Sequence, residues 1–450
     1  MSLLRYTKHT AAAVLLLTSA QANAFAPTNF FRSYDAAIQL PFADRDTDFM
    51  LGLQVEAGER DKCRNLNRDP RNVLQIYDDT QATLAMIEDP VPGATADPAF
   101  VAARFGVLTA LGVSFDPPLP ADGTTGQLLL TGNFKEADFT FLSAYHFLHS
   151  RTFGTFSFSA FVPVVYKKVS NVSILDLTDP NAIIGGGIVL PRGTRVQQFL
   201  TNDLKNNVKR MGNLNLDDWQ KTDIGDVSFF IDWRKDVHTE HSLFNTVTFL
   251  AKLGVTCPTA EKRDEDQAFS MALGNDGAWG IPLGVGFHVD LMHHVTVGGN
   301  YDVTFLFDET HNRRLKTHPN QTEFLLINKG RATKKHGETW QADGFIRIHR
   351  VIKGLSAKFA YQFVRHNEDE LTPKTAGFDK TIINSARSLR AWHVHNYIFS
   401  VDYNLAPHGD DDEDAHRRIV PQISLFFKFA DDAKNLIDTR TIGGQLGFSF

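Results

Sequence analysis

Apolar and polar residues alternate along most of the chain, in runs of about ten residues that are separated by turn-forming stretches. Between 283 and 291, for example, Leu283, Val285 and Phe287 alternate with glycine, histidine and aspartate. A period of two places alternate side chains on opposite faces of a β-strand. The pattern therefore predicts strands at 49–57, 137–147, 156–166, 227–233, 247–255, 283–291, 295–307, 340–348, 355–363, 397–405, 419–429 and 440–450.

The connections between these twelve strands alternate between long and short. The long ones are 59–133, 173–222, 261–280, 311–337, 368–390 and 431–439, and the short ones lie near 149–151, 236–241, 293–294 and 353–354. The exception is 406–418, which stands where a short connection is expected but is long and carries the acidic run 410–414. An antiparallel up-and-down barrel with both termini on one side has this parity.

The first long connection leaves the strand count open between twelve and fourteen. It contains a helix-like stretch at 80–87 and apolar residues at mixed spacing in 97–115. An extra hairpin would give fourteen strands; otherwise the segment covers the mouth or folds into the lumen. A second helix is predicted within 196–211, where apolar residues recur at helical spacing, and it either covers the rim or binds a partner.

A soluble β-sandwich would also alternate, with the apolar face as its core. The C-terminus favours a membrane barrel instead, because Leu446, Phe448 and the terminal Phe450 share one strand face and no polar tail follows. This segment resembles the closing strand of Gram-negative outer-membrane β-barrels of the porin or channel-like class. The resemblance implies an all-β, transmembrane antiparallel barrel, with these three residues as the assembly signal for the barrel-assembly machinery.

The N-terminus predicts export. Residues 1–24 have basic Arg5 and Lys8, an apolar run and an Ala22-Asn23-Ala24 cleavage site, which together form a signal-peptide pattern. Residues 25–46 are expected to be a periplasmic extension or small plug, and 47–450 the barrel. No later run of 18 apolar residues offers a helical span. The expected location is the cell outer membrane, in contact with its lipid.

Composition adds limited detail. Phe is abundant, at 36 residues against 6 Met, which suits the aromatic girdles of a barrel. The net charge of −6 gives no indication of nucleic-acid binding. The two cysteines, Cys63 and Cys257, could pair in an oxidising compartment, but two residues do not form a disulfide framework.

The polar strand face is the expected lumen lining, and it carries both signs of charge in near balance. The candidate lumen-facing residues are Asp226, Asp232, Arg234, Lys252, His288, Asp290, Asp302, Asp343, Arg347, Lys358, Asp402 and Lys428. Such charges pair across strands or meet water, because an unpaired charge at low dielectric is costly. The lining predicts a polar interior with weak ion selectivity.

Histidines raise the question of a metal. His393 and His395 have a spacing compatible with metal binding, but they fall in the lipid-side register, where an interfacial role is the simpler interpretation. His293 and His294 are expected in a solvated turn, and the inward residues His146, His288, His349 and His366 form no group that sequence can bring together. No metal and no cofactor are predicted.

The predicted function is an outer-membrane channel that passes small solutes passively. Neither a Gly-x-Ser-x-Gly elbow nor a His-Glu-x-x-His motif is present, so enzymatic activity is not expected. The alternatives are a hydrophobic-compound transporter that resembles the fatty-acid channels, with 25–46 inside the barrel, a surface adhesin, or an outer-membrane enzyme.

Overall fold

The computed structural model describes residues 49–86, 127–177, 183–184, 188–189, 203–239, 243–291, 294–352, 354–405, 420–437 and 440–449. The proposed signal peptide, the 25–46 segment, the 97–115 stretch and Phe450 lie outside these ranges. No helix in the described part of the chain is long and apolar enough to cross a membrane.

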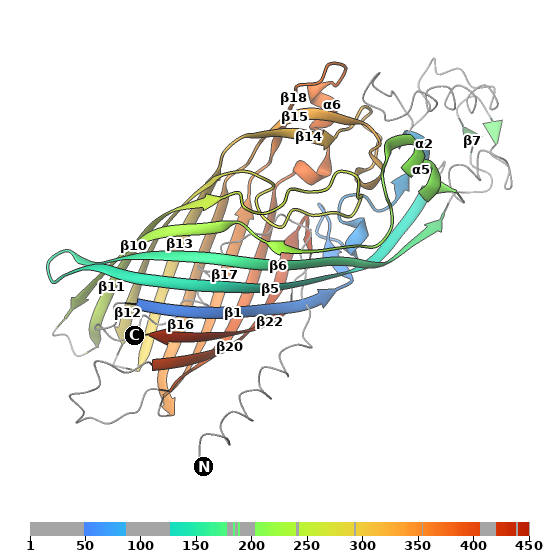
Figure 1. Ribbon diagram of the computed structural model, residues 1–450. Helices are drawn as coiled ribbons and strands as arrows, with labels where there is room; N and C mark the ends of the chain where they lie inside the picture. Colours follow the sequence, from blue (N-terminus) through green and yellow to red (C-terminus); the bar gives the residue numbers. More distant parts are fainter. Residues whose placement is uncertain are drawn as a thin grey trace, which may run out of the picture.

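Twelve long antiparallel strands close into a barrel (Figure 1). They are β1 (Phe49–Arg60), β5 (Gln127–Ser150), β6 (Gly154–Asp176), β10 (Val227–His238), β11 (Phe244–Cys257), β12 (Gly280–Leu291), β13 (Val295–Leu306), β16 (Thr339–Ile352), β17 (Leu355–His366), β19 (Trp392–Asn404), β20 (Val420–Lys434) and β22 (Arg440–Ser449). Each pairs with the next, and β22 closes the ring by pairing with β1 from Met50↔Ser449 to Ala57↔Ile442. The prediction of twelve strands is confirmed.

Two short strands pair with the wall without widening the ring. β4 (Gln81–Ala82) pairs with β5, and β9 (Trp219–Ile224) pairs with the second half of β6. β9 runs almost directly into β10, with only Gly225 and Asp226 between them. The outer halves of β5 and β6 therefore project beyond the closed part of the barrel, as Figure 1 shows.

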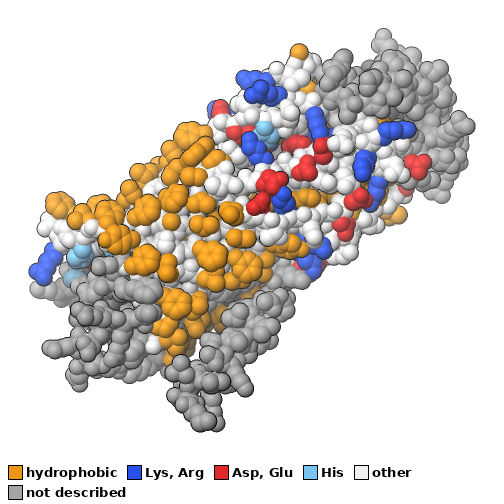
Figure 2. Space-filling model, viewed as in Figure 1, with side chains coloured by type: hydrophobic (Ala, Val, Ile, Leu, Met, Phe, Trp, Pro, Cys, Tyr) orange, Lys and Arg blue, Asp and Glu red, His pale blue; other side chains and the backbone are white. Residues whose placement is uncertain are grey.

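The two faces of the sheet have inverted polarity relative to a soluble protein. Apolar side chains on the outer face are exposed, such as Val285 at 58% and Phe141 at 54%, whereas Gln54 and Glu56 on the inner face are 2% and 1% exposed. On the face drawn in Figure 2, apolar side chains form a broad band from the middle of the barrel towards the end that carries the short turns, and charged side chains gather towards the other end. Exposed apolar surface of this extent is stable only against hydrocarbon, which excludes the soluble sandwich.

The short connections lie together at one end of the barrel, here called the turn end, and the long ones at the other, the loop end. The turns are 151–153, 239–243, 292–294 and 353–354, close to their predicted positions. The long connection 405–419 also joins two strands at the turn end, and 406–419 lie outside the described residues.

At the loop end, segments from several connections pack into a shared structure, here called the loop cap. Its secondary structure comprises β2 (Lys62–Arg64), β3 (Pro70–Asn72), α2 (Thr83–Met86), α5 (Leu204–Gly212), β14 (Glu309–Arg314), β15 (Lys329–Lys335), β18 (Glu370–Pro373), α6 (Lys380–Ile383) and β21 (Leu436–Ile437), with 3-10 turns at Val73–Gln75, Glu323–Leu325 and Arg387–Leu389. The strands β7 (Ile183–Ile184) and β8 (Ile188–Val189) form a separate pair. Both predicted helices exist in shorter form, as α2 and α5.

A continuous apolar core holds the loop cap together. Leu74, Val208, Phe269 and Phe324 come from four different connections and are all almost fully buried in one cluster. A second cluster forms beneath the sheet of β14, β15 and β18. The helix α5 buries Leu204, Val208 and Met211 in the first cluster. It therefore covers the rim, which is one of the two roles predicted for this helix.

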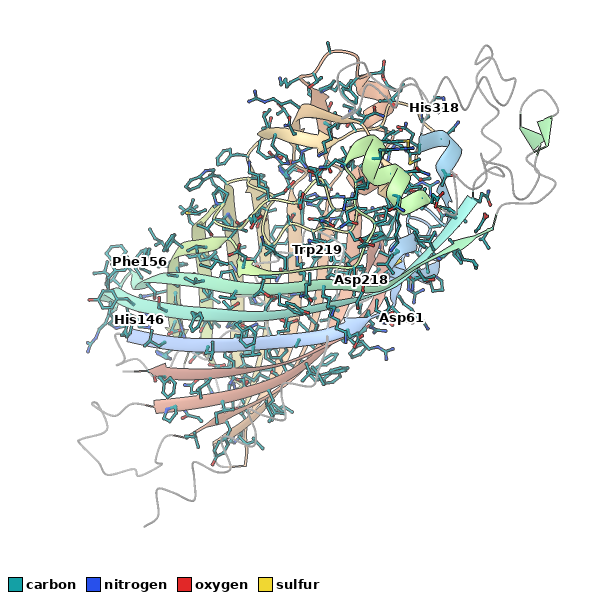
Figure 3. All side chains as sticks on the ribbon, turned by 45° about the vertical axis from the view of Figure 1, so that its right-hand side comes forward. Asp61, His146, Phe156, Asp218, Trp219 and His318 are labelled. Atoms are coloured by element: carbon teal, nitrogen blue, oxygen red, sulfur yellow. The ribbon has the colours of Figure 1, made fainter. Side chains whose placement is uncertain are left out.

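The wall also contains polar contacts that fix individual strands. Figure 3 shows His146 and Phe156 towards the turn end and Asp218 and Trp219 nearer the loop end. Asp218 accepts hydrogen bonds from the backbone N–H groups of Asn171 and Val172 at 3.1 and 3.0 Å. Both cysteines are free thiols; Cys63 is buried, and its Sγ donates to the Asn72 carbonyl.

Candidate functional site

The structure places all twelve candidate lumen residues on the inner side of the wall. Eleven belong to barrel strands in the inward register, from Asp232 on β10 to Lys428 on β20, and Asp226 lies at the junction of β9 and β10. They are half-buried or buried, although they are charged or polar.

Opposite charges on the inner wall form ion pairs between strands. The distance between Lys252 Nζ and Asp302 Oδ1 is 2.6 Å across two strand pairings, and that between Arg347 and Asp402 is 2.8 Å. Lys428 lies 3.2 Å from Glu56, an inner residue that the candidate set omits. These side chains are at most 14% exposed, so neighbouring side chains cover most of each charged pair.

Hydroxyl and amide groups bind the remaining acids. Ser159 donates to Asp232 at 2.6 Å, Asn300 donates to Asp343 at 2.7 Å, and Thr296 donates to Asp290 at 2.5 Å. The polar wall is therefore a network of cross-strand contacts in which charge is largely compensated locally.

The inner wall also carries aromatic residues that the sequence analysis did not include. Phe230, Phe345 and Phe426 each lie opposite a glycine on the adjoining strand, in the pairs Phe230↔Gly254, Phe345↔Gly298 and Phe426↔Gly443. A Cβ at any of these glycines would come within 3 Å of the ring. The sequence signal was present as phenylalanine in the polar register, and only the strand pairing shows that glycine provides the space.

Two of these rings join aliphatic residues on the strands between them. Phe345 of β16, Ala360 of β17, Ile398 of β19 and Phe426 of β20 form one buried cluster. The Lys358 ammonium lies 4.5 Å from the centre of the Phe345 ring. The interior is thus polar with an apolar patch, rather than uniformly polar as predicted.

A loop from the loop end folds against the inner wall. The connection 258–279 between β11 and β12 is buried without interruption from Ala268 to Asp276. Its Leu273 and Ala260 pack against Val165, an inward residue of β6. Of the first loop, 59–133, the residues Val73, Leu74, Ile76 and Met86 belong to the core of the loop cap. Residues 87–126 lie outside the described ranges, so the inward fold expected as one alternative for this loop stays a prediction.

Two charged wall residues clamp this loop. The Asp226 carboxylate accepts hydrogen bonds from the backbone N–H groups of Ala260 at 3.0 Å and Asn275 at 2.5 Å. Lys167, which is 1% exposed, donates to the Ala272 carbonyl at 2.9 Å. A Cβ on Gly274 would lie 2.4 Å from the Asp226 carboxylate, so the loop approaches the wall closely only because this residue is glycine. The sequence identified Asp226 as a lumen residue but not its partner, 49 positions away.

An ionic cluster ties the end of this loop to the cap. Arg313 on β14 pairs with Asp276 at 2.8 Å and with Glu309, which also contacts His311. Burial opposes ionisation of Asp276, but the charges of Arg313, Lys334 and His311 outweigh it and lower the pKa of this carboxyl. The loop is held at both ends, by the barrel wall and by the cap.

A second buried polar group connects the cap to β17. Asp369 accepts from His366 at 3.0 Å and pairs with Lys334 at 2.8 Å, while Thr339 contacts the other nitrogen of His366 at 2.9 Å. Burial opposes ionisation of Asp369, yet the Lys334 charge and the His366 contacts hold the pKa of this carboxyl well below its usual range. Nearby His336 has its pKa lowered to about 3 by burial and by the Lys334 charge.

This Thr-His-Asp arrangement has the order of a hydrolase triad, but its surroundings are structural. The side chains of His366 and Asp369 are each 6% exposed, Trp392 stacks on the His366 ring, and Asp369 also accepts from the Gly337 N–H. A nucleophile needs access to substrate. The contacts of these residues connect the sheet of β14, β15 and β18 to the barrel strand β17.

The four inward histidines have separate partners. His146 contacts Ser157, His288 contacts Asn300, His349 contacts Thr296 and His366 contacts Asp369. His393 and His395 lie on the outer face, as their register predicted, and the fold brings Asp432 of β20 beside them. His294 lies at the 292–294 turn, and His293 lies outside the described residues.

Comparisons with known proteins find distant similarity only, among solved structures. No protein-family model matches the sequence, and no curated protein matches it. Among solved structures, the chain is similar to an outer membrane channel from Pseudomonas putida F1 (10% identity, TM-score 0.45, covering 92% of this chain and 100% of that one). It is also similar to the transport unit of the autotransporter AIDA-I from Escherichia coli (7%, 0.36, 94% and 96%) and to the NanC porin (8%, 0.27, 72% and 98%). Similarity at this level supports no inference about function.

Proposed function

We propose that this protein is an outer-membrane channel for small solutes, and that the loop 258–279 restricts passage through it. The observation that carries the proposal is the clamp of this loop against the inner wall by Asp226 and Lys167. A loop held against the inner face of the wall at the loop end lies at the mouth through which a solute would pass.

The barrel provides the physical requirements of a membrane pore. Closing the sheet through β1 and β22 satisfies the backbone hydrogen bonds that hydrocarbon cannot satisfy. The apolar outer band faces lipid, and the loop end is assigned to the exterior because long loops project outward in this architecture. Export by residues 1–24 and assembly through Leu446, Phe448 and Phe450 belong to the same proposal.

Selectivity follows from the charge of the inner wall. Lys252, Arg347 and Lys428 are each paired with an acid, so no continuous stripe of one sign is formed by these residues. A compensated wall attracts cations and anions weakly and to similar extents. The solutes are therefore expected to be small and hydrophilic, with size and hydration more important than the sign of their charge.

The test is single-channel conductance in planar bilayers for the wild-type chain and Asp226→Asn. The substitution weakens two hydrogen bonds to the loop, each charge-assisted and worth about 1.5–3 kcal/mol. We expect Asp226→Asn to increase the time spent in a high-conductance state at least tenfold. Asp223→Asn is the matched control, since this carboxylate accepts from the Ile224 N–H, immediately after it in β9.

Heat-modifiable gel migration shows whether the wild type and Asp226→Asn fold. If both fold and neither conducts, the channel proposal is contradicted. If both proteins conduct equally, the protein is a channel but the loop 258–279 does not restrict passage through it.

A second candidate is a route for hydrophobic compounds, which the apolar patch of Phe345, Ala360, Ile398 and Phe426 favours. If solutes dock there, decanoate should block the conductance of the wild-type chain, and Phe345→Ala should relieve the block. Phe359→Ala, on the outward face of β17, is the control. Block that is unaffected by Phe345→Ala would reject this candidate.

A further inference from the structure

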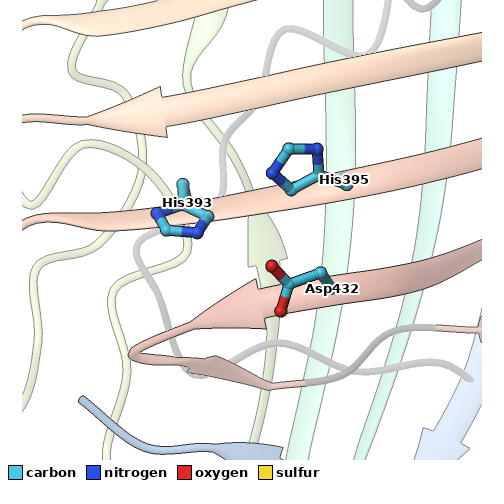
Figure 4. A group of neighbouring side chains, drawn as sticks. All are labelled: His393, His395 and Asp432. Carbon is cyan, nitrogen blue, oxygen red and sulfur yellow. The ribbon is translucent and has the colours of Figure 1, made fainter. Parts of the chain in front are cut away.

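Two histidines and an aspartate converge on the outer face of the barrel near the loop end. His393 and His395 project from β19, and Asp432 projects from the neighbouring strand β20 (Figure 4). One nitrogen of each ring and one carboxylate oxygen all lie within 4.8 Å of one another. All three residues are partly exposed, so water can reach them.

A β-bulge creates this arrangement. The register between β19 and β20 shifts by one residue between His395 and Asn396: Asn396 pairs with Ala430, whereas His395 pairs with Asp432. Asp431 is the additional residue. In a regular ladder Asp432 would pair with Val394, whose side chain is buried on the inner side, and would point away from both histidines. Bulges that redirect a side chain in this way are common beside functional sites.

The three groups have the chemistry of a site for a first-row transition metal. Neutral imidazole nitrogen and carboxylate oxygen are ligands for Zn²⁺ and for Co²⁺, Ni²⁺ and Cu²⁺, while Ca²⁺ and Mg²⁺ prefer oxygen alone. The Tyr361 hydroxyl lies 2.6 Å from Nδ1 of His395. A proton on Nδ1 shared with this oxygen leaves the lone pair of Nε2 for a metal, and a partner of this kind orients many metal-binding histidines.

We propose that His393, His395 and Asp432 bind one divalent transition-metal ion of the Zn²⁺ class, with water in the remaining positions. The site is separate from the lumen and independent of the channel proposal. Asp432 also pairs with Arg68 of the loop cap through Oδ2, at 3.1 Å. A bound ion would share or replace this contact, and in doing so it would connect β19 and β20 to the segment that follows β2.

The surrounding charges do not favour an anion instead. Arg365 and Lys434 both pair with His393 across the strands, but their long side chains can extend away, and Arg68 is already paired. An anion at the position between the two rings would lie beside the Asp432 carboxylate and be repelled by it.

A second group in the described residues is less suitable. Asp276, Glu309 and His311 also place their ligand atoms within 4.8 Å, but the Arg313 guanidinium already pairs with both carboxylates there. A metal would have to displace a buried positive charge, which makes this cluster an internal ionic contact.

The experiment is Zn²⁺ titration by isothermal calorimetry on the folded, full-length protein in detergent, without a polyhistidine tag. The wild type should bind one Zn²⁺ per chain, His393→Gln/His395→Gln should lose binding at least a hundredfold, and Tyr361→Phe should weaken it about tenfold. Co²⁺ should give visible absorption bands in the wild type that the double variant lacks.

His238→Gln, which changes a histidine near the turn end that contacts Thr246, is the matched control and should bind as the wild type. No binding by the wild type at millimolar Zn²⁺ would overturn the proposal. Retained binding in the double variant, or loss of binding in His311→Gln, would also overturn it by placing the ion elsewhere.

Discussion

A single outward residue shows how strongly the membrane controls this sequence. Val285 is 58% exposed and lies near the middle of β12, within the apolar band. Placing arginine at the midplane of a barrel costs about 2–4 kcal/mol, and close to an interface the cost falls to about 0–1 kcal/mol. We expect Val285→Arg to lower the free energy of unfolding by the larger amount and Val297→Arg, near the turn end of β13, by the smaller. Urea unfolding in lipid vesicles measures both, and equal effects would contradict the assignment of the midplane.

Inward residues behave differently, and the structure corrects a simple expectation about them. Thr296, next to Val297, sits in the polar register, where a charged side chain would be tolerated in an open, water-filled lumen. It is instead 7% exposed and bonded to both Asp290 and His349. An arginine there would break two hydrogen bonds and overfill the space, so this position is sensitive even though it faces away from lipid.

At the scale of an element, the three-stranded sheet of β14, β15 and β18 should respond to acid. The pKa of His336 is lowered to about 3 by burial and by Lys334, whereas an unfolded histidine titrates near 6.5. Between these values the unfolded chain binds a proton that the folded chain excludes, so stability falls as pH falls below about 6.5. Asp78 opposes this trend, because burial raises its pKa to about 6.

Comparison with His336→Gln isolates the histidine, because Asp78 is present in both proteins. From pH 7 to pH 5, the wild type should lose about 2 kcal/mol relative to His336→Gln, since each pKa unit corresponds to about 1.4 kcal/mol. Urea unfolding followed by tryptophan fluorescence at the two pH values measures the difference. A constant difference between the two proteins would show that His336 binds a proton as readily in the folded chain as in the unfolded one, and would contradict the lowered pKa.

At the scale of the whole molecule, the C-terminal strand completes the ring. β22 pairs with both β1 and β20, and Leu446 and Ile442 on its outer face are exposed to the lipid side. We expect Phe450→Asp to reduce the amount of folded barrel in the outer membrane severalfold, because the last strand carries the proposed assembly signal. Heat-modifiable migration of membrane fractions measures it. Ser449→Asn, one residue earlier and on the inner face, is the control. Normal assembly of Phe450→Asp would show that Phe450 is not part of the assembly signal.

The alternation of side chains predicted where the twelve strands lie, which face their residues take and the end of the barrel at which each connection lies, while the choice between twelve and fourteen strands needed the structure. These properties are local, because a period of two and the parity of an up-and-down sheet follow from neighbouring residues alone. The positions of Asp232, Lys252 and Lys428 on the inner face could therefore be read without a structure. So could the outward register of His393 and His395.

Tertiary structure decided which of these residues meet. The pairing of Lys252 with Asp302, the space that Gly254 leaves for Phe230, and the contact of Asp226 with Asn275 all depend on strand register or on loop packing between distant segments. The bulge that turns Asp432 towards His395 is a shift of one residue, and a shift of one residue reverses the face of every side chain beyond it. A one-dimensional pattern specifies faces, whereas partners require the register, and the register is settled only when the whole barrel closes.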